Sequence, residues 1–96
     1  MLPLPDALVI GAQEYKVSLV DRFEQEPKNA WGFCDERSKT LQFAAEFPNE
    51  RLLLITYFHE CIHAIENEYG LDLKEKDVDR LAQGVTQAVL ALVAAA

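Results

Sequence analysis

Residues 49 to 70 read NERLLLITYFHECIHAIENEYG, and this stretch decides the fold around it. Its apolar side chains recur every three or four residues, the spacing of one face of an α-helix; they are Leu54, Ile55, Phe58, Cys61, Ile62, Ile65 and Tyr69. Asn49 is a suitable N-cap, and Gly70 stands where a left-handed residue commonly ends a helix. The stretch therefore predicts a helix from Arg51 to Tyr69.

The only two histidines of the chain lie four positions apart in this helix, with a glutamate after the first: His59, Glu60 and His63. The pattern H-E-x-x-H arises by accident on the order of once in 500 chains of this size. Residues four apart share one side of a helix, so both imidazoles can hold one zinc ion. Glu60 points about 100° away, and its carboxylate can take a proton from a zinc-activated water. The alternative is two partly exposed histidines that bind no metal.

The third zinc ligand has to be a carboxylate, because catalytic zinc usually has three protein ligands and the chain has no third histidine. Glu66 shares the helical side but follows His63 by only three residues, at the wrong height. The start of a second helix is better placed, because Gly70 lets the chain turn back. The candidates downstream of the motif are Glu66, Glu68, Asp72, Glu75, Asp77 and Asp79.

A second helix is predicted after Gly70, with the apolar stripe Val78, Leu81, Ala82, Val85, Val89 and Leu92. Asp72 and Glu75 have the spacing of a capping box, in which the glutamate side chain binds the backbone at the helix start. Capping alone would account for Glu75 without any metal. The capping role and the ligand role of Glu75 therefore compete as interpretations.

Upstream of the helices, apolar side chains recur at every second position, a spacing that is typical of strands. Residues 13–20 alternate, and residues 31–34 and 41–44 alternate on either side of a polar turn over residues 35–39. Three strands of this length are about the minimum for a stable sheet that a helix covers. The predicted fold is α+β, a three-stranded antiparallel sheet packed against two helices.

The remaining N-terminal segments carry no strand or helix signal. Residues 1–12, which contain Pro3 and Pro5, are predicted to be an irregular lead-in, and residues 21–29 a polar connection. Trp31 and Phe33 are expected to face the core of the sheet rather than a substrate.

Length and charge limit the classes of function. The chain has 96 residues and is expected to form a single domain over residues 1–96. Its net charge of −7 and its lack of a basic run make nucleic acid an improbable partner.

No signal peptide or membrane span is predicted, so a cytoplasmic location without membrane attachment is expected. Cys34 and Cys61 are expected to be free thiols, as in a reducing compartment.

The segments HECIHA (59–64) and EKDVDRLAQG (75–84) resemble the zincin metallopeptidases, and within them the gluzincin arrangement. The hairpin WGFCDERSKTLQF is similar to that of small phage and prophage zincins related to the ImmA/IrrE-like metallopeptidases. The resemblance covers roughly residues 13 to 92. It implies a peptide-bond hydrolase with zinc held by His59, His63 and Glu75. Asp79 would support a histidine or serve as the alternative ligand, and Glu60 would be the general base.

Two questions about turnover stay open at this stage. No oxyanion-stabilising group is evident, and Tyr57 and Tyr69 are the candidates. Glu75 follows His63 by only twelve positions, which is closer than in typical gluzincins. A zinc-stabilised binding or regulatory module of phage origin, without catalysis, is therefore the rival interpretation. In the peptidase interpretation, an extended peptide or protein substrate would lie beside an edge strand, at residues 31–34 or 41–44.

Overall fold

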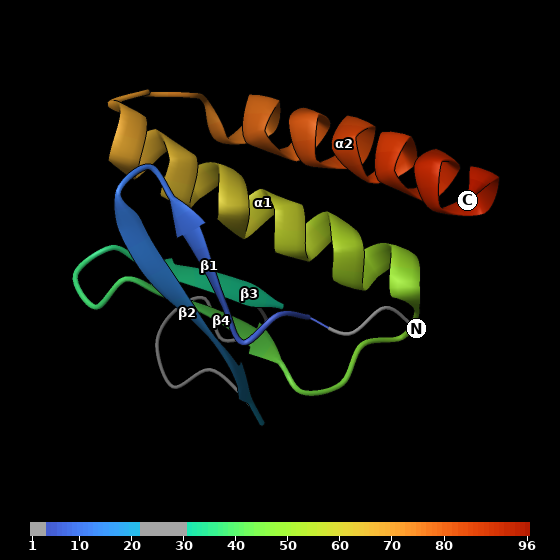
Figure 1. Ribbon diagram of the computed structural model, residues 1–96, viewed down its shortest axis with the longest axis horizontal. Coiled ribbons are helices and arrows are strands. Elements are labelled where there is room, and N and C mark those ends of the chain that lie inside the picture. The colour runs from blue at the N-terminus through green and yellow to red at the C-terminus, as the bar shows by residue number, and fades with distance from the viewer. Residues whose placement is uncertain (1–3, 22–30) are drawn as a thin grey trace.

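The chain forms four strands followed by two helices in a computed structural model that describes residues 4–21 and 31–96 (Figure 1). The elements are β1 (Ala7–Ile10), β2 (Gln13–Val20), β3 (Gly32–Asp35), β4 (Thr40–Ala44), α1 (Glu50–Tyr69) and α2 (Glu75–Ala95). The predicted connection over residues 21–29 lies outside the described residues except for Asp21, and so do the first three residues of the predicted lead-in.

The sheet differs from the prediction in both strand number and strand direction. Its order is β1-β2-β4-β3, and β2 pairs in parallel with β4, whereas the other two pairs are antiparallel. The predicted three-stranded antiparallel sheet is therefore wrong. A four-stranded mixed sheet stands in its place.

The extra strand, β1, comes from the supposed lead-in. Residues 7–10 read ALVI, an apolar run too short and too uniform to show a period of two. They pair with the start of β2 through a hairpin whose two loop residues are Gly11 and Ala12. Gly11 has a φ of 62°, which only glycine adopts without strain in such a turn.

The parallel pair arises because β4, and not β3, lies next to β2. Leu41 and Phe43 of β4 have no exposed surface, whereas every residue of β3 is only half-buried. The more apolar strand of the hairpin thus takes the inner position, where both of its edges are paired. As a result β4 is not an edge strand, and β3 forms the free edge beside α1.

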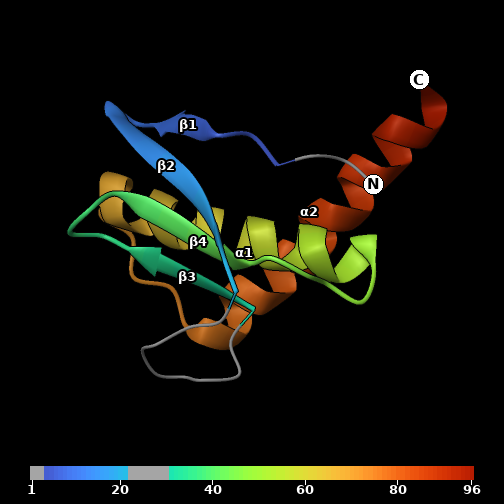
Figure 2. The same cartoon turned by 90° about the horizontal axis from the view of Figure 1, so that it is seen from below.

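α1 covers one face of the sheet and separates it from α2, as Figures 1 and 2 show. The predicted caps are confirmed: the Asn49 side chain accepts a hydrogen bond from the Leu52 N–H at 2.8 Å, and Gly70 is left-handed with a φ of 67°. The core between sheet and helix contains Ile10, Tyr15, Leu41, Phe43, Cys61 and Ala64. Both cysteines are free thiols.

α2 packs on the outer side of α1 with only part of its predicted stripe. Val78 and Ala82 are completely buried, but Leu81 and Leu92 are 48% and 72% exposed. The C-terminal end of α2 extends beyond the start of α1 (Figures 1 and 2). Within the described ranges, neither helix is long and apolar enough to cross a membrane.

Candidate metal centre

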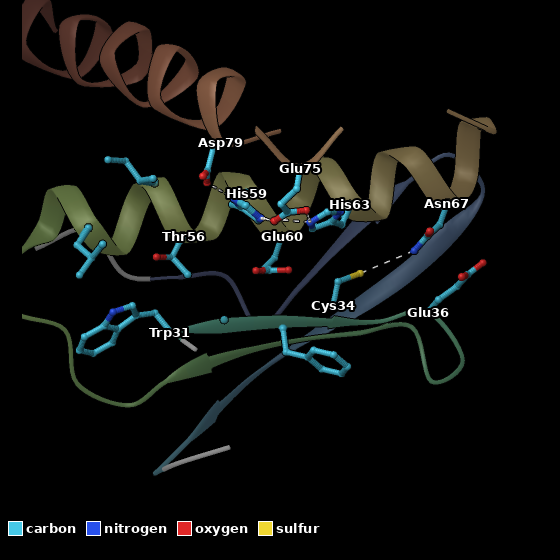
Figure 3. Close-up of a pocket in the computed structure, with 14 residues that line it drawn as sticks. Trp31, Cys34, Glu36, Thr56, His59, Glu60, His63, Asn67, Glu75 and Asp79 are labelled. Atoms are coloured by element: carbon cyan, nitrogen blue, oxygen red, sulfur yellow. Dashed lines mark hydrogen bonds and ion pairs between the residues drawn. The ribbon is translucent and has the colours of Figure 1, made fainter. Parts of the chain in front are cut away.

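Three predicted ligands from two helices converge on one point. His59 and His63 lie one turn apart on α1, and Glu75 is the first residue of α2 (Figure 3). The two Nε2 atoms are 3.2 Å apart, and Glu75 places Oε1 2.6 Å from His59 Nε2 and Oε2 3.2 Å from His63 Nε2. The three side chains can together hold a metal ion, since their donor atoms all lie within 4.8 Å of one another.

The other ring nitrogen of each histidine contacts a second carboxylate. His59 Nδ1 lies 2.9 Å from Asp79 Oδ1, and His63 Nδ1 lies 2.8 Å from Glu66 Oε1. A carboxylate accepts a hydrogen bond from Nδ1–H and thereby leaves the Nε2 lone pair free. With the proton on Nδ1, each histidine directs an Nε2 lone pair to the point that Glu75 also faces.

The donor set fits a zinc ion on two grounds. Nitrogen and oxygen atoms that converge within 3.2 Å need a proton or a cation between them, because their lone pairs otherwise repel one another. Ligand atoms about 2.0–2.1 Å from a tetrahedral zinc are roughly 3.3 Å from each other. The separations of 3.2 Å between the two Nε2 atoms and between His63 Nε2 and Glu75 Oε2 are close to that edge length, whereas His59 Nε2 and Glu75 Oε1, 2.6 Å apart, are at hydrogen-bond distance and would move apart around a zinc ion. Imidazole and carboxylate are ordinary zinc ligands.

Glu75 is not a helix cap, so the predicted capping box is wrong. The N-cap of α2 is Lys74, and no side chain caps the helix. Glu66 instead holds the connection between the helices, because its Oε2 accepts a hydrogen bond from the Leu73 N–H at 2.8 Å. Glu66 therefore positions His63 with one oxygen and the segment before Glu75 with the other.

Glu60 lies beside the three converging side chains and points into the space between α1 and β3 (Figure 3). It is 8% exposed and has no hydrogen bond to any described residue. Burial raises the pKa of its carboxyl group above the ordinary value, and positive charge on His59 and His63 acts in the opposite direction. A buried, unpartnered carboxyl group beside side chains that could hold a metal ion is suited to exchange protons with a water on that ion.

A groove with a cavity volume of 610 Å³ runs between β3 and α1 past these residues. One end is lined by Trp31 and is called the Trp31 end; the other is lined by Cys34, Glu36 and Asn67 and is called the Glu36 end (Figure 3). Figure 3 shows Trp31 and the pair Glu36 and Asn67 on opposite sides of Glu60.

Gly32 lets β3 come close to α1 at this groove. A Cβ atom on Gly32 would lie 2.7 Å from Thr56 Cγ2 and 3.0 Å from Glu60 Cγ. Real side chains do not tolerate so short a contact, so any larger residue would move the strand away from Glu60. Glycine inside a strand often marks such a close approach, so Gly32 is the sequence signal for this contact.

Several expectations about neighbouring residues are corrected. Trp31 and Phe33 line the groove rather than the core; Trp31 is 41% exposed and contacts the Phe47 ring. Tyr57 packs on Phe43 in the core. Tyr69 is 63% exposed at the far end of α1. Neither tyrosine lines the groove, so neither is placed to stabilise an oxyanion.

The structure thus brings together His59, His63, Glu75, Asp79 and Glu60, all singled out from the sequence. The sequence analysis does not predict the roles of Glu66 and Gly32. It treats Glu66 as a candidate ligand, but a position three residues after His63 suits contact with the far ring nitrogen. In the comparisons with known proteins, no family model, curated protein or solved structure matches the chain.

Proposed function

We propose that the protein is a zinc-dependent metallopeptidase of the gluzincin type. The observation that supports this most strongly is the convergence of both Nε2 atoms with the Glu75 carboxylate, beside the buried carboxyl group of Glu60. In this proposal His59, His63 and Glu75 hold the metal. Asp79 and Glu66 orient the two imidazoles through Nδ1.

The chemistry that zinc supplies when bound is Lewis acidity, which polarises a carbonyl and makes water acidic enough to attack near neutral pH. Glu60 takes the proton of the attacking water and delivers it to the leaving amine. Burial favours this exchange, because it raises the pKa of the Glu60 carboxyl above its ordinary value and so makes the carboxylate a stronger base toward the proton of the water.

The edge of β3 offers a binding mode for an extended peptide. The Ala44 N–H donates to the Trp31 carbonyl at 2.9 Å, so residues 31 and 33 point their backbone groups toward β4. Gly32 and Cys34, which alternate with them, direct their N–H and C=O groups away from β4. A peptide that adds to this edge gains main-chain hydrogen bonds next to Glu60.

Substitution of Glu60 by Gln tests the peptidase proposal. Glu60→Gln keeps the size of the side chain and removes its basicity, so we expect zinc to stay bound while peptide cleavage falls about 10²- to 10⁴-fold. Cleavage of a peptide library, followed by mass spectrometry, is the measurement, and Glu46→Gln is the matched control with the same change of charge away from the groove. Zinc-loaded wild type that cuts no peptide, or Glu60→Gln that cuts at the wild-type rate, contradicts the proposal.

A zinc-stabilised binding module without turnover is the second candidate. It is favoured by one observation: among the described residues that line the groove, there is no Tyr, Arg or Lys to stabilise an oxyanion. In that case the edge of β3 would hold a partner segment without cutting it. Zinc-dependent capture of a protein that wild type and Glu60→Gln bind equally and leave intact would favour this candidate over the peptidase.

A further inference from the structure

The direction in which a peptide would lie in the groove follows from β3. The strand runs from Gly32, beside Thr56 and Glu60, to Cys34, whose Sγ lies 3.8 Å from the Asn67 amide nitrogen. An added strand pairs slightly better antiparallel than parallel. The amino side of a bound peptide would then lie at the Glu36 end, and the carboxyl side at the Trp31 end.

The described groove is lined by acidic groups and by no Lys or Arg. Glu75 and Asp79 belong to the histidine cluster, and Glu60 points into the space between α1 and β3 beside it. Glu36 is the remaining carboxylate, and it has no hydrogen bond or ion pair with any described residue. Its neighbour Asp35 is engaged in the hairpin turn, where it accepts a hydrogen bond from the Arg37 N–H at 3.0 Å. Glu36 is therefore free to receive a cation.

The pKa of the Cys34 thiol responds to the negative charge at this end of the groove. Burial first of all, and then the negative charge of Glu60 and Glu36, raise the pKa of its thiol to about 12. Burial disfavours a charge of either sign, but the negative charge of Glu60 and Glu36 disfavours an anion and attracts a cation. Asn67 adds an amide to the same wall, 3.8 Å from the thiol.

Resting on the proposed peptidase function, we propose that the Glu36 end binds a cationic group on the amino side of the scissile bond. The group is a Lys or Arg side chain or the N-terminal ammonium of the peptide, since both present N–H donors to a carboxylate. The groove thereby selects basic segments, which the net charge of −7 also attracts at a distance.

Three sets of synthetic peptides test this selection. They are identical except for Lys, Gln or Glu in the positions on the amino side of the cleaved bond, and each is made with a free and an acetylated N-terminus. The zinc-loaded wild type should cut the Lys peptides about two- to fivefold more efficiently than the Gln peptides at low salt, the range expected for an exposed ion pair. High salt should reduce this ratio.

Variants assign the effect to Glu36. Glu36→Gln should bring the Lys-to-Gln ratio close to one, whereas Glu46→Gln should keep it. Faster cleavage of Lys than of Gln peptides that persists after acetylation identifies the side chain as the cation. Faster cleavage of free than of acetylated peptides, whatever the side chain, identifies the N-terminal ammonium. Equal rates on the Lys, Gln and Glu peptides in both their free and acetylated forms overturn this inference alone. If zinc-loaded protein cuts no peptide at all, the proposed function fails and the inference fails with it.

Discussion

At the scale of single residues, each histidine is held by carboxylates on both sides of its ring. Asp79 contacts Nδ1 of His59, and Glu75 faces its Nε2. In the same way, Glu66 contacts Nδ1 of His63. Such outer partners fix which nitrogen carries the proton and raise the basicity of the other. The affinity for zinc should therefore depend on residues that never touch the metal.

Asp79→Asn tests this dependence. The amide cannot accept the Nδ1 proton as strongly as a carboxylate, so we expect zinc affinity to fall about 10- to 100-fold with the fold intact. Competition with a fluorescent chelator measures the affinity. Asp77→Asn, which makes the same change two residues earlier on α2, should bind zinc as the wild type does. Equal affinity in all three proteins would show that Asp79 does not support His59.

Much of the cluster could be predicted from the sequence because its geometry is local. His59, Glu60 and His63 are related by one helical turn, so helix geometry alone sets their directions. The position of Glu75 depends on the path of the chain after Gly70. The residues alone left several downstream carboxylates open, and only the resemblance to the gluzincins singled out Glu75. The capping-box interpretation failed because the helix begins at Glu75 itself, with Lys74 as its N-cap.

At the scale of elements, the close approach of β3 to α1 creates the groove. This approach depends on Gly32, whose missing side chain leaves room for Thr56 and Glu60. The hairpin and both helices were predicted from their periods and turn residues. The choice of β4 as the partner of β2 could not be predicted, because it depends on how well each strand is buried rather than on any local pattern.

Gly32→Ala should destabilise the fold by about 1–3 kcal/mol, because its methyl group would overlap Thr56 Cγ2. Gly84→Ala is the matched control. Gly84 lies within α2 with no atom within 4 Å of an added Cβ, so this change should stabilise the protein by about 0.5–1 kcal/mol. Urea unfolding gives both values. Similar effects of the two substitutions would refute the close approach.

A second contact between elements predicts how stability changes with pH. Glu68 on α1 accepts hydrogen bonds from Lys39 Nζ at 2.8 Å and from the Tyr15 hydroxyl at 2.5 Å. The Lys39 bond first, and then the Tyr15 bond, lower the pKa of Glu68 below its ordinary value of 4.5. Ionised Glu68 therefore stabilises the fold above that pH, and this contribution is lost as the pH falls below it.

Glu68→Gln should be less stable than wild type at neutral pH, and the difference should shrink as the pH falls below about 4.5. Thermal unfolding in the presence of a chelator measures this without interference from metal release. Glu46→Gln should show no such convergence with wild type. A difference between Glu68→Gln and wild type that stays constant with pH would argue against the lowered pKa.

At the scale of the whole molecule, the core is thin and zinc should add to its stability. A chain of 96 residues buries only about 60–65% of the surface that it exposes when unfolded. Metal that binds the folded chain alone stabilises it by about 2.7 kcal/mol when free zinc is a hundredfold above its dissociation constant. The cluster joins α1 to α2, so zinc should strengthen the contact between the two helices.

Calorimetry with and without a chelator checks this stabilisation. We expect zinc to raise the unfolding temperature by several degrees and magnesium to leave it unchanged, because imidazole ligands favour zinc over magnesium. An unfolding temperature that does not respond to zinc would mean that the cluster does not bind zinc to the folded chain.

The zinc content of the purified chain tests the central claim most directly. After incubation with zinc and extensive dialysis, mass spectrometry of the metal should find about one zinc per wild-type chain, as a three-ligand site requires, and far less in His63→Ala. A wild-type chain that retains only a small fraction of one zinc, or His63→Ala that retains as much as wild type, would contradict the account.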